Sequence, residues 1–145
     1  MHASRTCAGR PTGKTNTTTL VDGLKPGRRE YLLYLPLYNG VSSVEVGVAK
    51  DAKLFKADPR PAAKAKPIVF YGTSITQGGC ASRPGMSYTS ILGRRLERPI
   101  FNFGFSGNGK MELEVARFLV ELDPAVFIVD GVGNYQSDVM EAYPA

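Results

Sequence analysis

The spacing of hydrophobic and polar positions changes along the chain near residue 67. In residues 41–48 the last valines alternate with Glu45 and Gly47, a period typical of a half-buried strand. Residues 17–24 and 30–37 are rich in β-branched and aliphatic side chains and also predict strands, and Asn39-Gly40 is a tight-turn signal. The pattern predicts short antiparallel β segments within residues 17–48.

Downstream, short apolar runs alternate with helical periodicity. The runs at 68–71, 99–103 and 125–129 predict buried strands, whereas apolar positions recur at helical spacing in 88–97 and 111–122. This β-α-β-α-β order predicts an α/β fold with a parallel sheet and right-handed crossovers.

One segment, DAKLFKADPRPAAKAKP at 51–67, is rich in Lys, Ala and Pro and is interpreted as a linker. We therefore expect a β-rich region over 1–50, the linker over 51–67 and an α/β region over 68–145.

Composition narrows the possible functions. The 145 residues carry a net charge of +5, but the basic residues are scattered, so we expect a solvated basic surface and no nucleic-acid partner. A nucleic-acid-binding module is the alternative that the charge alone motivates. No run approaches the roughly 18 apolar residues of a membrane span, and residues 1–16 do not resemble a signal peptide, which leaves the compartment open. Cys7 and Cys80 are expected as free thiols, with a single disulfide between them as the alternative. With one histidine and two scattered cysteines, no metal or cofactor site is predicted.

Candidate chemistry lies in the loops that follow the predicted parallel strands, because ligands meet open parallel sheets at the strand ends. Ser74 follows the first strand, Gly107 the second and Asn134 the third. Ser74 offers a nucleophilic hydroxyl, Gly107 a backbone N–H and Asn134 a neutral side-chain donor. Each has an ordinary alternative: a turn or helix-capping serine, a strand-to-helix turn with Asn108 as a cap, and a turn asparagine.

The segment AGRPTGKT at 8–15 fits a relaxed phosphate-loop pattern. It lacks the preceding buried strand and the following helix that the mechanism requires, so no phosphate site is predicted there.

Taken together, YGTSITQGG, NFGFSGNG and VDGVGNY resemble the first three sequence blocks of the SGNH (GDSL-type) hydrolases, with Thr73 where the usual motif has Asp. The resemblance covers about half the chain, and residues 31–48 are similar to the end of a small β-sandwich domain found in one branch. It implies a flavodoxin-like sheet and a serine-dependent acyl or acetyl esterase, or a lipase-like enzyme, whose substrates are small-molecule or carbohydrate esters. Ser74 would be the nucleophile, and the Ser74 N–H, the Gly107 N–H and the Asn134 side chain would bind the oxyanion.

The family's base, a histidine in an Asp-x-x-His block, has no counterpart in the sequence. The only histidine is His2, which has no such context, and nothing assigns a catalytic role to Asp130 or Asp138. The resemblance therefore indicates a fragment of a longer esterase with a truncated sheet, from which we expect self-association through an exposed edge. The alternative function is a catalytically weak or inactive relative that at most binds a ligand at the same place.

Overall fold

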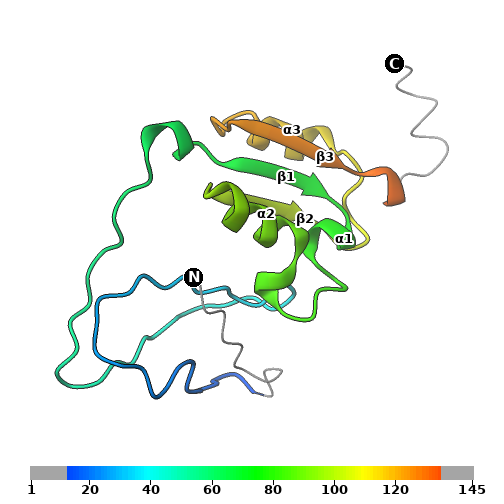
Figure 1. Ribbon diagram of the computed structural model, residues 1–145. Coiled ribbons are helices and arrows are strands. Elements are labelled where there is room, and N and C mark those ends of the chain that lie inside the picture. Colours follow the sequence, from blue (N-terminus) through cyan, green and yellow to red (C-terminus); the bar gives the residue numbers. More distant parts are fainter. Residues whose placement is uncertain (1–12, 135–145) are drawn as a thin grey trace. The chain divides into compact units, whose positions relative to one another are not determined.

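The computed structural model describes residues 13–134 of the chain. Its contacts divide the chain into two units, and the division falls between Tyr31 and Leu32. All the helices and strands of the described residues lie in the unit that begins at Leu32, as Figure 1 shows. The domain boundaries expected near residues 50 and 67 stay predictions.

The centre of this unit is a three-stranded parallel sheet of order β2-β1-β3. The strands are β1 (Ile68–Gly72), β2 (Ile100–Gly104) and β3 (Val126–Asp130). β1 lies between the other two strands, in register from Ile68, paired with Ile100 and Val126, to Gly72, paired with Gly104 and Asp130. The predicted α/β class, strand positions and parallel topology are confirmed.

Helices cover both faces of the sheet (Figure 1). They are α1 (Ser74–Gln77), α2 (Tyr88–Leu96) and α3 (Leu113–Leu119), with short 3-10 turns η1 (Ala62–Lys64), η2 (Pro84–Met86) and η3 (Val132–Asn134). Alternation along β1 shows the two faces, because the Phe70 ring packs edge-on against Tyr88 of α2 while the Tyr71 hydroxyl reaches Glu112, the N-cap of α3. Helices α2 and α3 lie on opposite faces because their right-handed crossovers, from β1 to β2 and from β2 to β3, run in opposite directions across the sheet.

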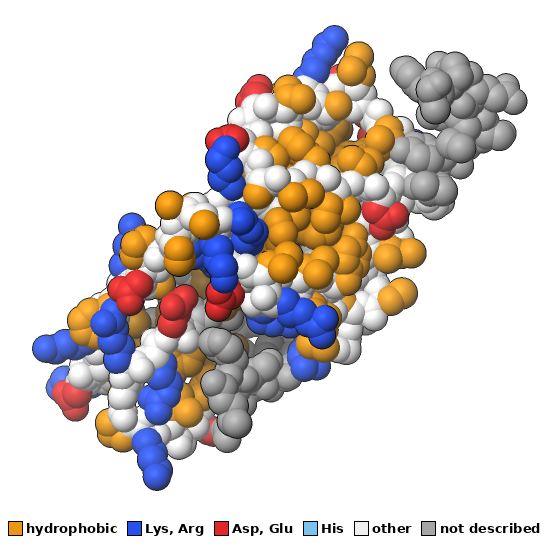
Figure 2. All heavy atoms as spheres, turned by 45° about the horizontal axis from the view of Figure 1, so that its top comes forward, with side chains coloured by type: hydrophobic (Ala, Val, Ile, Leu, Met, Phe, Trp, Pro, Cys, Tyr) orange, Lys and Arg blue, Asp and Glu red, His pale blue; other side chains and the backbone are white. Residues whose placement is uncertain are grey.

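The hydrophobic core of the described residues is concentrated on β1. Ile68, Val69, Phe70 and Tyr71 are all buried, as expected for a central strand covered on both faces. β2 and β3 each have a single strand neighbour among residues 13–134, and apolar side chains such as Phe127 and Val129 are about half exposed. Figure 2 shows hydrophobic side chains gathered on one face of the molecule. Self-association through the sheet edge stays a prediction.

The prediction of antiparallel β segments within residues 17–48 is wrong, because the structure has no strand between residues 13 and 61. The alternating valines of 41–48 are exposed, so no apolar surface covers the side that a half-buried strand must bury. A hairpin without such a surface is at best marginally stable. The alternation of apolar and polar residues in 41–48 is compatible with a strand, but these residues form none in the structure.

Two smaller expectations can also be compared with the structure. The helix predicted over 111–122 begins only at Leu113, because Met111 has a φ of 63° and therefore lies outside the helical region. Of the phosphate-loop-like segment, residues 8–12 lie outside the described residues, and no helix follows its last residues within 16–61. Across residues 13–134, no helix has the length and apolarity needed to cross a membrane.

Candidate active site

The three loops predicted to carry chemistry all leave the same edge of the sheet. Gly72, Gly104 and Asp130 are register partners at the last positions of their strands. Ser74, Gly107 and Asn134 follow these three strand ends within a few residues. The fold therefore brings the three candidate site loops to one edge.

Ser74 is the first residue of α1, and its side chain is partly exposed. Thr73 is the N-cap, and its hydroxyl accepts a 3.4 Å hydrogen bond from the Ile75 N–H. The capping role that was the alternative for Ser74 is therefore filled by Thr73 for α1 and by Ser87 for α2. Among residues 13–134 the Ser74 hydroxyl has no hydrogen-bond partner.

Gly104 lets the loop after β2 lie directly on α1. A Cβ at this position would be 2.0 Å from the Gln77 nitrogen and 2.5 Å from its Cα, closer than any side chain tolerates. The Phe105 N–H donates to the Gly72 carbonyl at 2.8 Å, which ties the same loop to the end of β1. These contacts join the first two site loops into one packed layer.

Gly107 stands at the tip of that loop with a φ of 72°, a left-handed conformation that favours glycine. The turn is closed beneath it, where the Asn108 and Gly109 N–H groups both donate to the Phe105 carbonyl, at 3.1 and 3.0 Å. Asn108 turns its side chain back to the Ser106 carbonyl at 3.2 Å rather than capping α3. Within the described part of the chain the Gly107 N–H has no acceptor.

Asn134 ends η3, where its backbone N–H donates to the Gly131 carbonyl at 3.1 Å. Its side-chain Nδ2 is buried and has no hydrogen-bond partner within residues 13–134. A buried amide donor without an acceptor is rare in native proteins and calls for an explanation. A ligand oxygen at this position would supply the missing acceptor.

Thr76 is a site-supporting residue that the sequence reasoning missed. Its fully buried hydroxyl lies 3.1 Å from Asp130 Oδ2 and 3.0 Å from the Tyr88 hydroxyl. A threonine has one proton to donate and an ionised carboxylate can only accept, so Thr76 donates to Asp130 and receives from Tyr88. The bond to Asp130 joins α1 to β3 and gives Asp130 a structural role, and the bond to Tyr88 joins α1 to α2. A threonine two residues after the serine was the only signal in the sequence.

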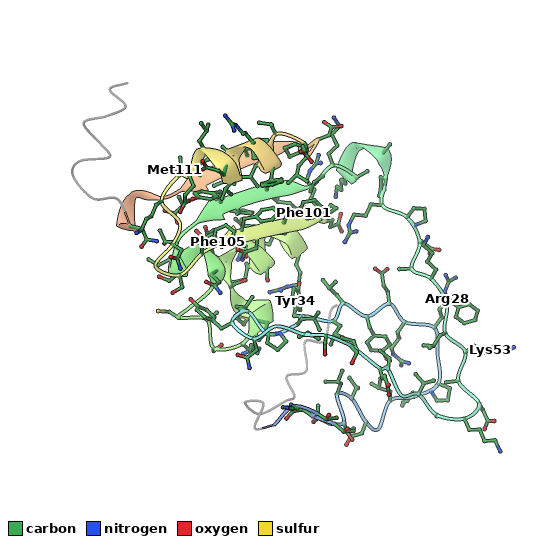
Figure 3. All side chains as sticks on the ribbon, turned by 180° about the vertical axis from the view of Figure 1, so that it is seen from behind. Arg28, Tyr34, Lys53, Phe101, Phe105 and Met111 are labelled. Carbon is green, nitrogen blue, oxygen red and sulfur yellow. The ribbon has the colours of Figure 1, made fainter. Side chains whose placement is uncertain are left out.

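Tyr71 holds the far end of the Gly107 loop. Its hydroxyl donates to Glu112 Oε2 at 2.6 Å and accepts from the Met111 N–H at 2.8 Å. Burial, aided by the Glu112 hydrogen bond, raises the pKa of Tyr71, and that same hydrogen bond lowers the pKa of Glu112. Figure 3 shows Met111 and Phe105 near the end of the sheet where the strands finish.

Residues 13–134 contain no group of three or more His, Cys, Asp or Glu side chains able to hold a metal ion. Cys80 is a free, exposed thiol, while Cys7, His2 and Asp138 lie outside the described residues.

Comparison with known proteins shows the family to which the chain belongs. Residues 65–143, which include all three loops, match the GDSL-like lipase/acylhydrolase family. The chain belongs to this family. Residues 3–54 match the N-terminal region of SGNH-hydrolase-type esterases, as the resemblance of residues 31–48 had implied.

A solved structure supports the assignment of this GDSL-like chain. It is a crystal structure of a Bacteroides ovatus protein named for its likeness to GDSL lipases, with 44% sequence identity and a TM-score of 0.68. The match covers 75% of this chain and 32% of the Bacteroides protein, so this chain matches about a third of that protein's length. A comparison with curated proteins gave no match.

Proposed function

We propose that this GDSL-like chain carries the nucleophile and the oxyanion-binding groups of a serine-dependent carboxylic ester hydrolase. The observation that carries the proposal is the buried, unpartnered Asn134 Nδ2, on a loop at the same sheet edge as the Ser74 hydroxyl and the Gly107 N–H. These three groups have the chemistry that an acyl-transfer site needs, which is one nucleophile and convergent hydrogen-bond donors.

In the proposed reaction, Ser74 Oγ bonds to the ester carbonyl carbon and its proton passes to a base. The carbonyl oxygen becomes an oxyanion that the Ser74 N–H, the Gly107 N–H and Asn134 Nδ2 bind. Collapse of this intermediate releases the alcohol, which takes up the proton, and leaves an acyl-serine that water hydrolyses to the carboxylic acid and free Ser74. Donors placed in advance stabilise the charge without reorganisation, and each is worth about 10²–10³ in rate.

Residues 13–134 contain no histidine that could accept the Ser74 proton. A histidine commonly takes the serine proton in such sites, and the chain's one histidine, His2, lies outside these residues. Asp130 is hydrogen-bonded to Thr76 at 3.1 Å, which is a structural contact. This favours a second candidate function, ligand binding at the same edge without turnover.

One experiment separates the two candidates. The 145-residue chain is treated with a fluorophosphonate, and the adduct is located by peptide mass mapping, alongside hydrolysis of p-nitrophenyl acetate. The hydrolase proposal expects an adduct on Ser74 that Ser74→Ala abolishes. The control is Ser43→Ala, because Ser43 is exposed and lies in a segment without helix or strand.

Asn134→Ala tests the oxyanion role. We expect kcat to fall by about 10²–10³ with KM nearly unchanged, because the lost donor acts in the transition state. An unlabelled Ser74, or hydrolysis that survives Ser74→Ala, would exclude the serine mechanism in this chain. Small-molecule and carbohydrate esters are the substrates that we propose to screen.

A further inference from the structure

The side chain of Gln77, the last residue of α1, bridges two segments that are far apart in the sequence. Its Nε2 donates to the Leu37 carbonyl at 3.0 Å, and its Oε1 accepts from the Ser106 N–H at 2.8 Å. Both ends of the amide are therefore used. The α1 helix that begins with Ser74 is joined through this one side chain to the Gly107 loop and to residue 37.

The Ser106 bond matters because Ser106 immediately precedes Gly107. No atom lies within 4 Å of the position that a Gly107 Cβ would take, so no side-chain packing restrains that residue there. The Gly107 N–H belongs to the peptide whose carbonyl, that of Ser106, accepts from Asn108 Nδ2 at 3.2 Å. The N–H of the preceding peptide, that of Ser106, donates to Gln77. On the other side of Ser106, Phe105 is tied to Gly72 at 2.8 Å.

The Leu37 bond brings in a second contact to α1. The adjacent Tyr38 hydroxyl donates to the Ser74 carbonyl at 3.2 Å. A Cβ at Gly78 would lie 2.5 Å from Leu37 Cδ1, so the Leu37 side chain packs against Gly78, the C-cap of α1. Residues 37–38 therefore contact both ends of the helix that carries the proposed nucleophile.

We propose that Gln77 is a positioning residue that aligns the Gly107 N–H for oxyanion binding, and that residues 37–38 hold Gln77 in place for this purpose. The inference rests on the proposed function of Ser74 and Gly107. It assigns a role in the reaction to a segment before residue 67, outside the three sequence blocks.

The chemistry of the amide provides the test. Glutamine donates and accepts, whereas ionised glutamate only accepts. Gln77→Glu therefore retains the Ser106 bond and loses the Leu37 bond, and Gln77→Met, of similar length, loses both. Gln77→Asn, one carbon shorter, is a polar second variant that cannot span the two partners.

The experiment measures kcat and KM for p-nitrophenyl acetate with the 145-residue chain, and hydrogen exchange of the Ser106 and Gly107 amides by NMR. Gln77→Met and Gln77→Asn are expected to lower kcat about tenfold or more with KM nearly unchanged, and to speed Ser106 exchange about tenfold, the equivalent of one lost hydrogen bond. Gln77→Glu keeps the bond to Ser106 and loses the bond to Leu37, so both of its values are expected to fall between those of the wild type and of Gln77→Met.

The outcomes separate the inference from the function on which it rests. If the wild type reacts at Ser74 and the Met and Asn variants keep its kcat, Gln77 has no positioning role. Faster Ser106 exchange without a fall in kcat, or a change in KM alone, would reduce the bond to a structural contact and overturn the inference. A wild type that neither hydrolyses the ester nor labels at Ser74 refutes the proposed function itself, and the positioning role with it.

Discussion

The Thr76 hydroxyl offers the sharpest test of how the site loops are held together. Thr76→Val replaces this hydroxyl by a methyl group of similar size and so removes the bonds to Asp130 and Tyr88 without opening a cavity. The variant leaves one carboxylate oxygen and one phenol hydroxyl without their partner. Both belong to elements other than α1, so the loss loosens α1 from its neighbours.

The expected cost follows from the two bonds. A hydrogen bond to a charged group contributes about 1.5–3 kcal/mol and a neutral one about 1 kcal/mol. Thr76 is fully buried, but Asp130 is only partly so and regains some water when the bond is lost. We therefore expect the free energy of unfolding to fall by about 2–3 kcal/mol, below the simple sum.

Urea unfolding followed by circular dichroism measures this change, given an unchanged m-value. Thr76→Ser keeps the hydroxyl and should lose only about 1 kcal/mol for the missing methyl group. Thr17→Val, at an exposed position, should stay within about 0.5 kcal/mol of the wild type. A Thr76→Val loss no larger than that of Thr76→Ser would show that the hydroxyl does not join these elements.

Two further changes probe the Gly107 loop. Gly109→Ala puts a Cβ 2.2 Å from the Gly72 carbonyl oxygen and should lower the free energy of unfolding by about 3 kcal/mol. The Cβ of Gly107→Ala meets no atom within 4 Å, so this variant should lose only about 1 kcal/mol, because of the positive φ. Equal losses of stability in urea unfolding would contradict the close approach of Gly109 to Gly72. Tyr71→Phe should lower the free energy of unfolding most at about pH 6–9. The lowered pKa of Glu112 stabilises the fold above the ordinary value of 4.5, and this contribution is lost as the pH falls. The raised pKa of Tyr71 stabilises the fold below the ordinary value of 10.0, and this contribution is lost as the pH rises. A wild-type-minus-variant difference that does not shrink at both extremes would argue against the Tyr71–Glu112 bond.

Sequence reasoning found the parallel sheet because buried strands produce a strong local signal. The run at 68–71 is apolar at every position, as a strand covered on both faces requires. The same reasoning failed for 41–48, where alternation shows only that one side of a strand could be buried. Whether a covering surface exists depends on residues far away in the sequence, and in this structure those valines are exposed.

The sequence by itself determined the α/β class, the order of the elements and the choice of Ser74, Gly107 and Asn134 as candidates, because periodicity and loop composition are local properties. Only the tertiary structure decided which groups stay unpaired and which are used. It left Asn134 Nδ2 buried without a partner, engaged Asp130 with Thr76, and joined Gln77 to Leu37 and Ser106. Hydrogen-bond pairing depends on distances between segments remote in sequence, and those distances exist only once the sheet has set the strand ends side by side.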